Sequence, residues 1–76
     1  MISTWTKIDP KRNCFRFYVI SLASDLFSAY VVSCEWGRID AKKTRRKVEV
    51  FNSFDEAMAQ VKRIEALRIK HHYHAA

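Results

Sequence analysis

Residues 14–36 read CFRFYVISLASDLFSAYVVSCEW, and the pattern of this segment indicates the centre of a β-sheet. Two runs within it, Cys14–Leu22 and Phe27–Trp36, are rich in the aromatic and β-branched residues that favour strands. The short Ala23–Asp25 segment between them predicts a turn. We therefore expect the two runs to pair as an antiparallel hairpin, because only a few residues connect them.

Side chains alternate between the two faces of a strand, so the sequence also predicts which residues lie together. On the first run, one face carries Phe15, Phe17 and Val19, and the other carries Arg16, Tyr18 and Ile20. On the second run, one face carries Tyr30, Val32, Cys34 and Trp36, with Ser28 nearest the turn.

Further elements are expected on both sides of the hairpin. Towards the N-terminus, Thr4–Ile8 alternates as a short strand, and Asp9–Asn13 is a turn because Pro10 fixes its φ angle. Towards the C-terminus, Gly37 predicts a turn or bulge with positive φ at the strand end. Lys47–Phe51 then alternates as another strand.

A helix is predicted from Phe54 to about Ile69 or Lys70. Ser53 is its expected N-cap, and Glu56 is the expected capping-box partner. Its apolar stripe recurs every three or four residues and contains Phe54, Ala57, Met58, Val61, Ile64 and Leu67. The sequence thus predicts one α+β domain over residues 1–76, with its core at about 4–73. In it, one amphipathic helix packs on one face of an antiparallel sheet of three to four strands, and the other face is left to solvent or a partner.

Composition limits the functions that the chain can have. Among 76 residues there is a single glycine, which excludes a Gly-rich phosphate loop and a dinucleotide fingerprint. No apolar run reaches the roughly 18–20 residues of a membrane span. The first residues lack the basic leader and apolar stretch of a secretion signal, so we expect a cytoplasmic protein without a membrane partner.

Catalytic and metal chemistry find little support in the sequence. The three histidines, His71, His72 and His74, lie in the last six residues, where we expect a loosely ordered tail. Cys14 and Cys34 are expected to be reduced and mostly buried, close to each other across the hairpin. The acidic residues are scattered and form no carboxylate pair for acid–base work. The sequence therefore predicts no enzyme, no catalytic residue, no metal site and no cofactor.

Positive charge is the strongest functional signal. The formal net charge is +6, and residues 38–47 hold six bases against one acid, Asp40. Such a balance favours a polyanionic partner, nucleic acid first. Together with the aromatic side chain and flexible joint that precede them, the basic residues form the candidate nucleic-acid-binding set: Trp36, Gly37, Arg38, Lys42, Lys43, Arg45, Arg46 and Lys47.

Residue types alone leave two interpretations of this set open. In the first, Trp36 stacks on a sugar or base and Arg38 grips a phosphate. In the second, Trp36 belongs to the core, Arg38 pairs with a carboxylate such as Glu35 or Asp40, and the basic segment is a solvated loop.

An ordered set of segments resembles the WGR domain, and in particular the small stand-alone WGR proteins of bacteria. The set spans roughly residues 7 to 73 and comprises Ile8–Asn13, Arg16–Tyr18, Asp25–Phe27, Glu35–Ile39, the pattern Phe51-x-Ser53-x-x-Glu56-Ala57, and Lys70-x-x-Tyr73. In DNA-dependent poly(ADP-ribose) polymerases this domain is a non-catalytic module. There, its tryptophan packs on the DNA backbone at a break, and its arginine joins domains.

The resemblance implies that Trp36 is a stacking element and that Arg38 contacts a phosphate or a partner. Two positions depart from the family pattern: Asp40 and His72 stand where the family usually has glycine. Asp40 tolerates left-handed backbone better than most residues, but its carboxylate repels phosphate. We therefore expect a DNA-binding module that contacts duplex, ends or nicks with weak sequence preference, and as the alternative a protein-interaction adaptor using the same surface.

Overall fold

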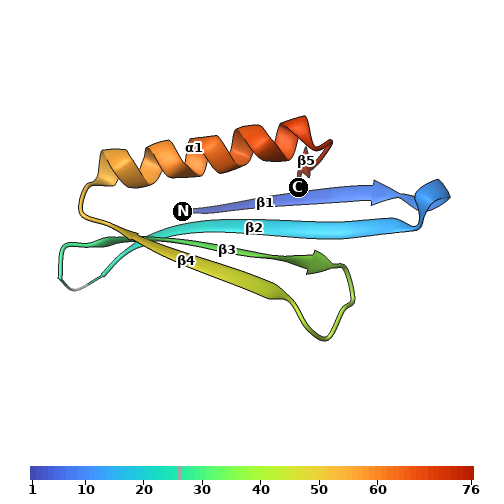
Figure 1. Ribbon diagram of the computed structural model, residues 1–76, viewed down its shortest axis with the longest axis horizontal. Helices are drawn as coiled ribbons and strands as arrows, with labels where there is room; N and C mark the ends of the chain where they lie inside the picture. The colour runs from blue at the N-terminus through green and yellow to red at the C-terminus, as the bar shows by residue number, and fades with distance from the viewer. Residues whose placement is uncertain (26) are drawn as a thin grey trace.

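The computed structural model describes residues 1–25 and 27–76 and shows one helix packed on an antiparallel sheet (Figure 1). Along the chain the elements are β1 (Ile2–Asp9), a 3-10 turn (Pro10–Arg12), β2 (Cys14–Ser24), β3 (Tyr30–Arg38), β4 (Arg45–Phe51), α1 (Phe54–Lys70) and β5 (His74–Ala75). The strand order is β4-β3-β2-β1-β5. The α+β class is confirmed, but the sheet has five strands rather than three or four.

The fifth strand comes from the C-terminal tail, which we expected to be loosely ordered. Instead, His74 pairs with Thr6 and Ala75 pairs with Trp5 of β1. The chain reverses here because His72 adopts a left-handed φ of 67°, and the Tyr73 amide donates back to the Arg68 carbonyl at 2.8 Å. This is the Schellman ending of a helix, with histidine at the position that usually holds glycine.

The central hairpin forms as predicted. β2 and β3 pair antiparallel, with Ile20 opposite Cys34 and Tyr18 opposite Trp36. The turn is longer than expected, because β2 continues to Ser24 and β3 begins only at Tyr30. The Asp25 carboxylate shapes this turn by accepting from the Phe27 and Ala29 amides at 2.8 and 2.9 Å. Leu26, within the Asp25–Phe27 segment of the family resemblance, lies outside the described residues.

Three local expectations are wrong. Gly37 has no positive φ: it continues β3, opposite Phe17, whose ring lies 3.6 Å from where a Cβ would be. Ser28 lies in the turn with φ of 63° rather than on the strand face. The two free cysteines are not neighbours, because Cys14 pairs with Asp9 at the far end of β2, away from Cys34.

The helix has the predicted bounds and covers one face of the sheet. Ser53 caps it by accepting from the Glu56 amide at 3.4 Å, although in the described part of the chain the reciprocal bond from Glu56 is not formed. The core lies between α1 and the strands and contains Trp5, Ile20, Leu22, Val32, Cys34, Ala57, Val61 and Ile64. Phe54 and Leu67, at the ends of the predicted stripe, are half exposed.

The opposite side of the sheet is covered by no element among the described residues. We call it the open face. Strand alternation from the observed register assigns to it Ile2, Thr4, Thr6, Ile8, Phe15, Phe17, Val19, Ser21, Ala23, Val31, Ser33, Glu35, Gly37, Arg46, Val48, Val50 and His74.

Candidate functional site

The β1–β2 connection and the β3–β4 loop lie at the same end of the sheet, beyond the C-terminal end of α1 (Figure 1). Between them is a concave surface of about 510 Å³, which is within the roughly 300–1,000 Å³ of ligand sites. We call it the Trp36 hollow. Its lining residues are Arg12, Asn13, Cys14, Arg16, Trp36, Gly37, Arg38, Lys43 and Arg45.

Trp36 stands on the helix side of β3 and is half-buried. Its ring stacks on Tyr18 of β2, with centroids 5.5 Å apart and planes within 13°. The pair packs against the core, so the indole is partly a core residue and partly a wall of the hollow. The core interpretation of Trp36 therefore holds in part, and stacking on a sugar or base stays a prediction.

Tyr18, the ring on which Trp36 stacks, is uncharged near neutral pH. Burial, together with a hydrogen bond to the Cys34 side chain, raises the pKa of Tyr18 from 10.0 to about 12. The guanidinium of Arg68 lies 4.0 Å from the centre of the Tyr18 ring and 5.1 Å from that of Tyr73. The stacked Tyr18 and Trp36 rings are thus neutral near pH 7, and the Arg68 guanidinium lies over the Tyr18 ring.

Arg38 is fixed by the turn that precedes β2. Its Nη1 and Nη2 donate to the carbonyl and the side-chain oxygen of Asn13, both at 3.1 Å. Its guanidinium carbon also lies 5.5 Å from the centre of the Phe15 ring. Within the described residues Arg38 has no carboxylate at ion-pair distance, so the expected alternative of a bond to Glu35 or Asp40 is wrong; Glu35 instead accepts from the Thr44 hydroxyl at 2.9 Å.

A row of three cations crosses the sheet beside Trp36. Lys7 of β1 lies opposite Arg16 of β2, and Arg16 lies opposite Arg38 of β3. Directly opposed side chains have Cβ atoms about 4.5–5.5 Å apart, and like charges in such pairs are destabilising. We call these residues the cation row. The register thus places three cations side by side, and Asn13 holds the guanidinium of the third, Arg38.

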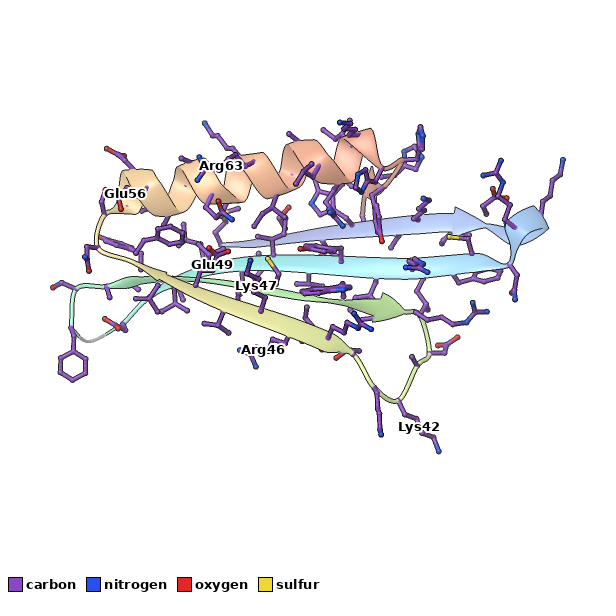
Figure 2. All side chains as sticks on the ribbon, in the orientation of Figure 1. Lys42, Arg46, Lys47, Glu49, Glu56 and Arg63 are labelled. Atoms are coloured by element: carbon purple, nitrogen blue, oxygen red, sulfur yellow. The ribbon has the colours of Figure 1, made fainter. Side chains whose placement is uncertain are left out.

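The basic segment contributes only in part to the Trp36 hollow. Lys43 and Arg45 line it with Trp36 and Arg38. Lys42 lies at the outer tip of the β3–β4 loop, while Arg46 and Lys47 project to opposite sides of β4 (Figure 2). Lys47 pairs with Glu49 at 3.8 Å, and Arg46 belongs to the open face. The structure therefore brings Trp36, Gly37, Arg38, Lys43 and Arg45 together and separates Lys42, Arg46 and Lys47 from them.

Sequence reasoning missed Arg12, Asn13 and Arg16 as lining residues. A usable signal was present for Arg16, because the alternation placed this cation on the same face as Tyr18 and Ile20. A second hollow adjoins the first through Cys14, Arg16 and Trp36 and extends to the end of α1. Its remaining lining residues are Lys7, Tyr18, Arg68, Lys70, His71, His72 and Tyr73.

The lining of the two hollows contains no acidic side chain from the described part of the chain. Nor do the described residues include a group of three or more histidine, cysteine or acidic side chains placed to hold a metal ion. Asp40, which follows β3, adopts a left-handed φ of 71°. No helix in the described chain has the length and apolarity to cross a bilayer.

One of two comparisons relates the chain to known proteins. A search of curated proteins found no match to the chain. A family model for the WGR domain matches residues 1–76, the whole chain. The match includes the Trp36–Arg38 tripeptide at the end of β3 and both elements that enclose the hollow. The chain therefore belongs to the WGR domain family.

Proposed function

We propose that this chain is a DNA-binding module that holds duplex ends or nicks by their backbone in the Trp36 hollow. The WGR family consists of non-catalytic, nucleic-acid-binding modules. The observation that carries the proposal is the gathering of Trp36 and cations from three separate segments around one acid-free surface: Arg12, Arg16, Arg38, Lys43 and Arg45.

Each part of the hollow suits a piece of nucleic-acid backbone. The half-buried indole of Trp36 offers apolar surface to a sugar or an exposed base, and stacking on an aromatic ring contributes about 1–3 kcal/mol per base. Arg38 has five N–H donors, and Asn13 occupies two of them, so three remain for a phosphate. These are backbone contacts, which position a protein without reading sequence.

Salt dependence tests the binding mode. We expect affinity for a short labelled duplex to fall with salt, with a log–log slope of about −3 to −4.5 for roughly 3–5 phosphate contacts. Fluorescence anisotropy with blunt, nicked, closed circular and single-stranded competitors then measures the preference for ends. A flat slope would instead support the adaptor alternative, and equal competition by the closed circle would exclude end recognition.

A pair of matched double variants tests the location. Lys43→Gln with Arg45→Gln removes one lysine and one arginine from the hollow, whereas Lys62→Gln with Arg63→Gln removes the same charges from the exposed side of α1. We expect the first pair to weaken duplex binding about tenfold and to flatten the slope by about 2. The second pair should change both quantities little. Equal losses would mean that net charge alone drives binding.

A third variant tests Trp36 itself. Because Trp36 packs on Tyr18, Trp36→Ala risks unfolding the domain, so Trp36→Phe is the useful change. Phenylalanine keeps an aromatic ring against Tyr18 but removes the second ring of the indole. We expect a folded protein by circular dichroism with reduced duplex affinity. Unchanged affinity would exclude stacking by this residue.

A further inference from the structure

The open face presents large apolar side chains to solvent on its outer strands. Ile2 and Ile8 of β1 are 74% and 57% exposed, and Val48 and Val50 of β4 are 51% and 64% exposed. The half-buried Phe17 and Val31 lie between them on β2 and β3. Contiguous apolar patches larger than a few hundred Å² are uncommon on monomers and mark interaction surfaces.

If a partner covered this face, several of its polar groups would keep hydrogen bonds that they already make within the chain. The Ser21 and Ser33 hydroxyls, opposite each other at its centre, hydrogen-bond to one another. The Glu35 carboxylate accepts from the Thr44 hydroxyl at 2.9 Å. Because these groups already have partners within the chain, the cost of removing them from water is reduced.

Charge on the open face indicates what kind of partner fits. Its strand positions in the described chain carry two charged side chains, Glu35 and Arg46, which are opposite each other across β3 and β4. The face is therefore neutral, although the chain has a net charge of +6. The strand positions of this face therefore offer no excess positive charge to attract a nucleic acid. A second copy of the chain finds an apolar surface without net repulsion, and a two-fold axis lets Arg46 of each copy face Glu35 of the other.

We propose that the open face is the interface of a symmetric homodimer, with the two sheets packed face to face. Four strands about 4.8 Å apart and about 24–37 Å in length give a face of roughly 600 Å² per copy, or about 1,200 Å² for the pair, at the lower end of stable interfaces. Pairing through the β4 edge is opposed by Arg45, Arg46 and Lys47, which repel the same residues of another copy.

Sedimentation equilibrium on the purified chain tests the dimer. We expect the apparent mass to rise from 9.0 kDa towards twice that value as concentration increases through the micromolar range. Added salt should strengthen association, because it screens repulsion between two chains of charge +6. A mass of 9.0 kDa at every concentration and salt level would overturn the proposal and leave the face to solvent or another protein.

Charged substitutions locate the interface. Val50→Lys and Val50→Glu place opposite charges on the open face, and Ile69→Lys and Ile69→Glu place them on α1 at a residue that is also 64% exposed. We expect both Val50 variants to dimerise at least about tenfold more weakly, since each buries an unpaired charge. Ile8→Lys, on the other side of the face, provides an independent check should the Val50 variants misfold. The Ile69 variants should behave as the unsubstituted chain; equal effects at both positions would overturn the proposal.

Discussion

Arg38 shows how a contact distant in sequence fixes an exposed side chain. It projects from the end of β3, but the group that holds it is Asn13, which lies in the turn between β1 and β2 with a left-handed φ of 51°. An arginine fixed in this way loses less side-chain entropy when it meets a phosphate than a free one does. This preorganisation depends on a long-range contact, so the residue types around Arg38 did not predict it.

Four described residues other than glycine have positive φ: Asn13, Ser28, Asp40 and His72. Asparagine and aspartate adopt this conformation readily, but histidine does so at greater cost. His72 is nevertheless the residue that allows the chain to leave α1 and form β5.

We predict that His72→Gly stabilises the domain. Glycine removes a left-handed strain of about 1–2 kcal/mol and costs about 0.5–1 kcal/mol through the greater entropy of the unfolded chain, so the free energy of unfolding should rise by up to about 1.5 kcal/mol. The adjacent His71, with φ of −91°, is the control: His71→Gly gains no strain relief and should destabilise. Urea denaturation of both variants measures the difference, and a His72→Gly protein less stable than the unsubstituted chain contradicts this account.

At the level of elements, the register of β1, β2 and β3 organises the site. One row across the sheet joins Trp5, Tyr18 and Trp36, and the cation row two positions along joins Lys7, Arg16 and Arg38. The first row packs in or against the core, and the second places like charges at opposed strand positions, where we expect repulsion. Stability and binding should therefore respond in opposite directions to changes in the cation row.

We predict that Arg16→Thr makes the unbound domain more stable and the DNA complex weaker. Removing the middle cation relieves two cross-strand repulsions, with an expected gain of roughly 0.2–1 kcal/mol at low salt. Arg46→Thr removes the same charge from a position opposite Glu35, where it is attractive, and should lower stability or leave it unchanged. Thermal unfolding and duplex titration of both variants measure these effects. Loss of stability in Arg16→Thr would show that the row is not strained.

Local signals in the sequence predicted most elements. The hairpin faces and the limits of α1 follow from alternation, helical spacing and the Ser53 cap, and the structure confirms them except at Ser28, which lies in the turn. β5 was missed because two residues carry no periodicity and because His72 gave no glycine signal. Gly37 was assigned to a turn because a lone glycine is compatible with a turn or with close packing inside a strand. The packing partner, the Phe17 ring, can be identified only once the strand register is known.

The candidate site was less predictable than the fold, for a geometric reason. A run of basic residues along one strand alternates between faces, so Arg45 reaches the Trp36 hollow and Arg46 cannot. Arg12, Asn13 and Arg16 come from another segment that meets β3 only through strand pairing. Charge density in the sequence therefore indicated the type of partner, while the choice of residues required the register.

Across the molecule as a whole, the two proposed binding surfaces lie on opposite sides of one sheet. The Trp36 hollow is on the α1 side, and the open face is on the other. If two copies pack through their open faces, both hollows point outward and away from each other. Such a dimer is able to hold two DNA segments at once, one on each outer side.

We predict that the unsubstituted chain bridges two short duplexes, which rests on both proposals above. With donor and acceptor dyes on separate duplexes, energy transfer should appear at protein concentrations that support the dimer. Val50→Lys and Val50→Glu should abolish the transfer although each still binds a single duplex, and because their charges differ in sign, a shared loss is not an effect on DNA attraction. The Lys43→Gln, Arg45→Gln variant should lose transfer by failing to bind. Equal transfer by the Val50 variants would show that bridging arises from charge alone, since polycations condense DNA without a defined interface.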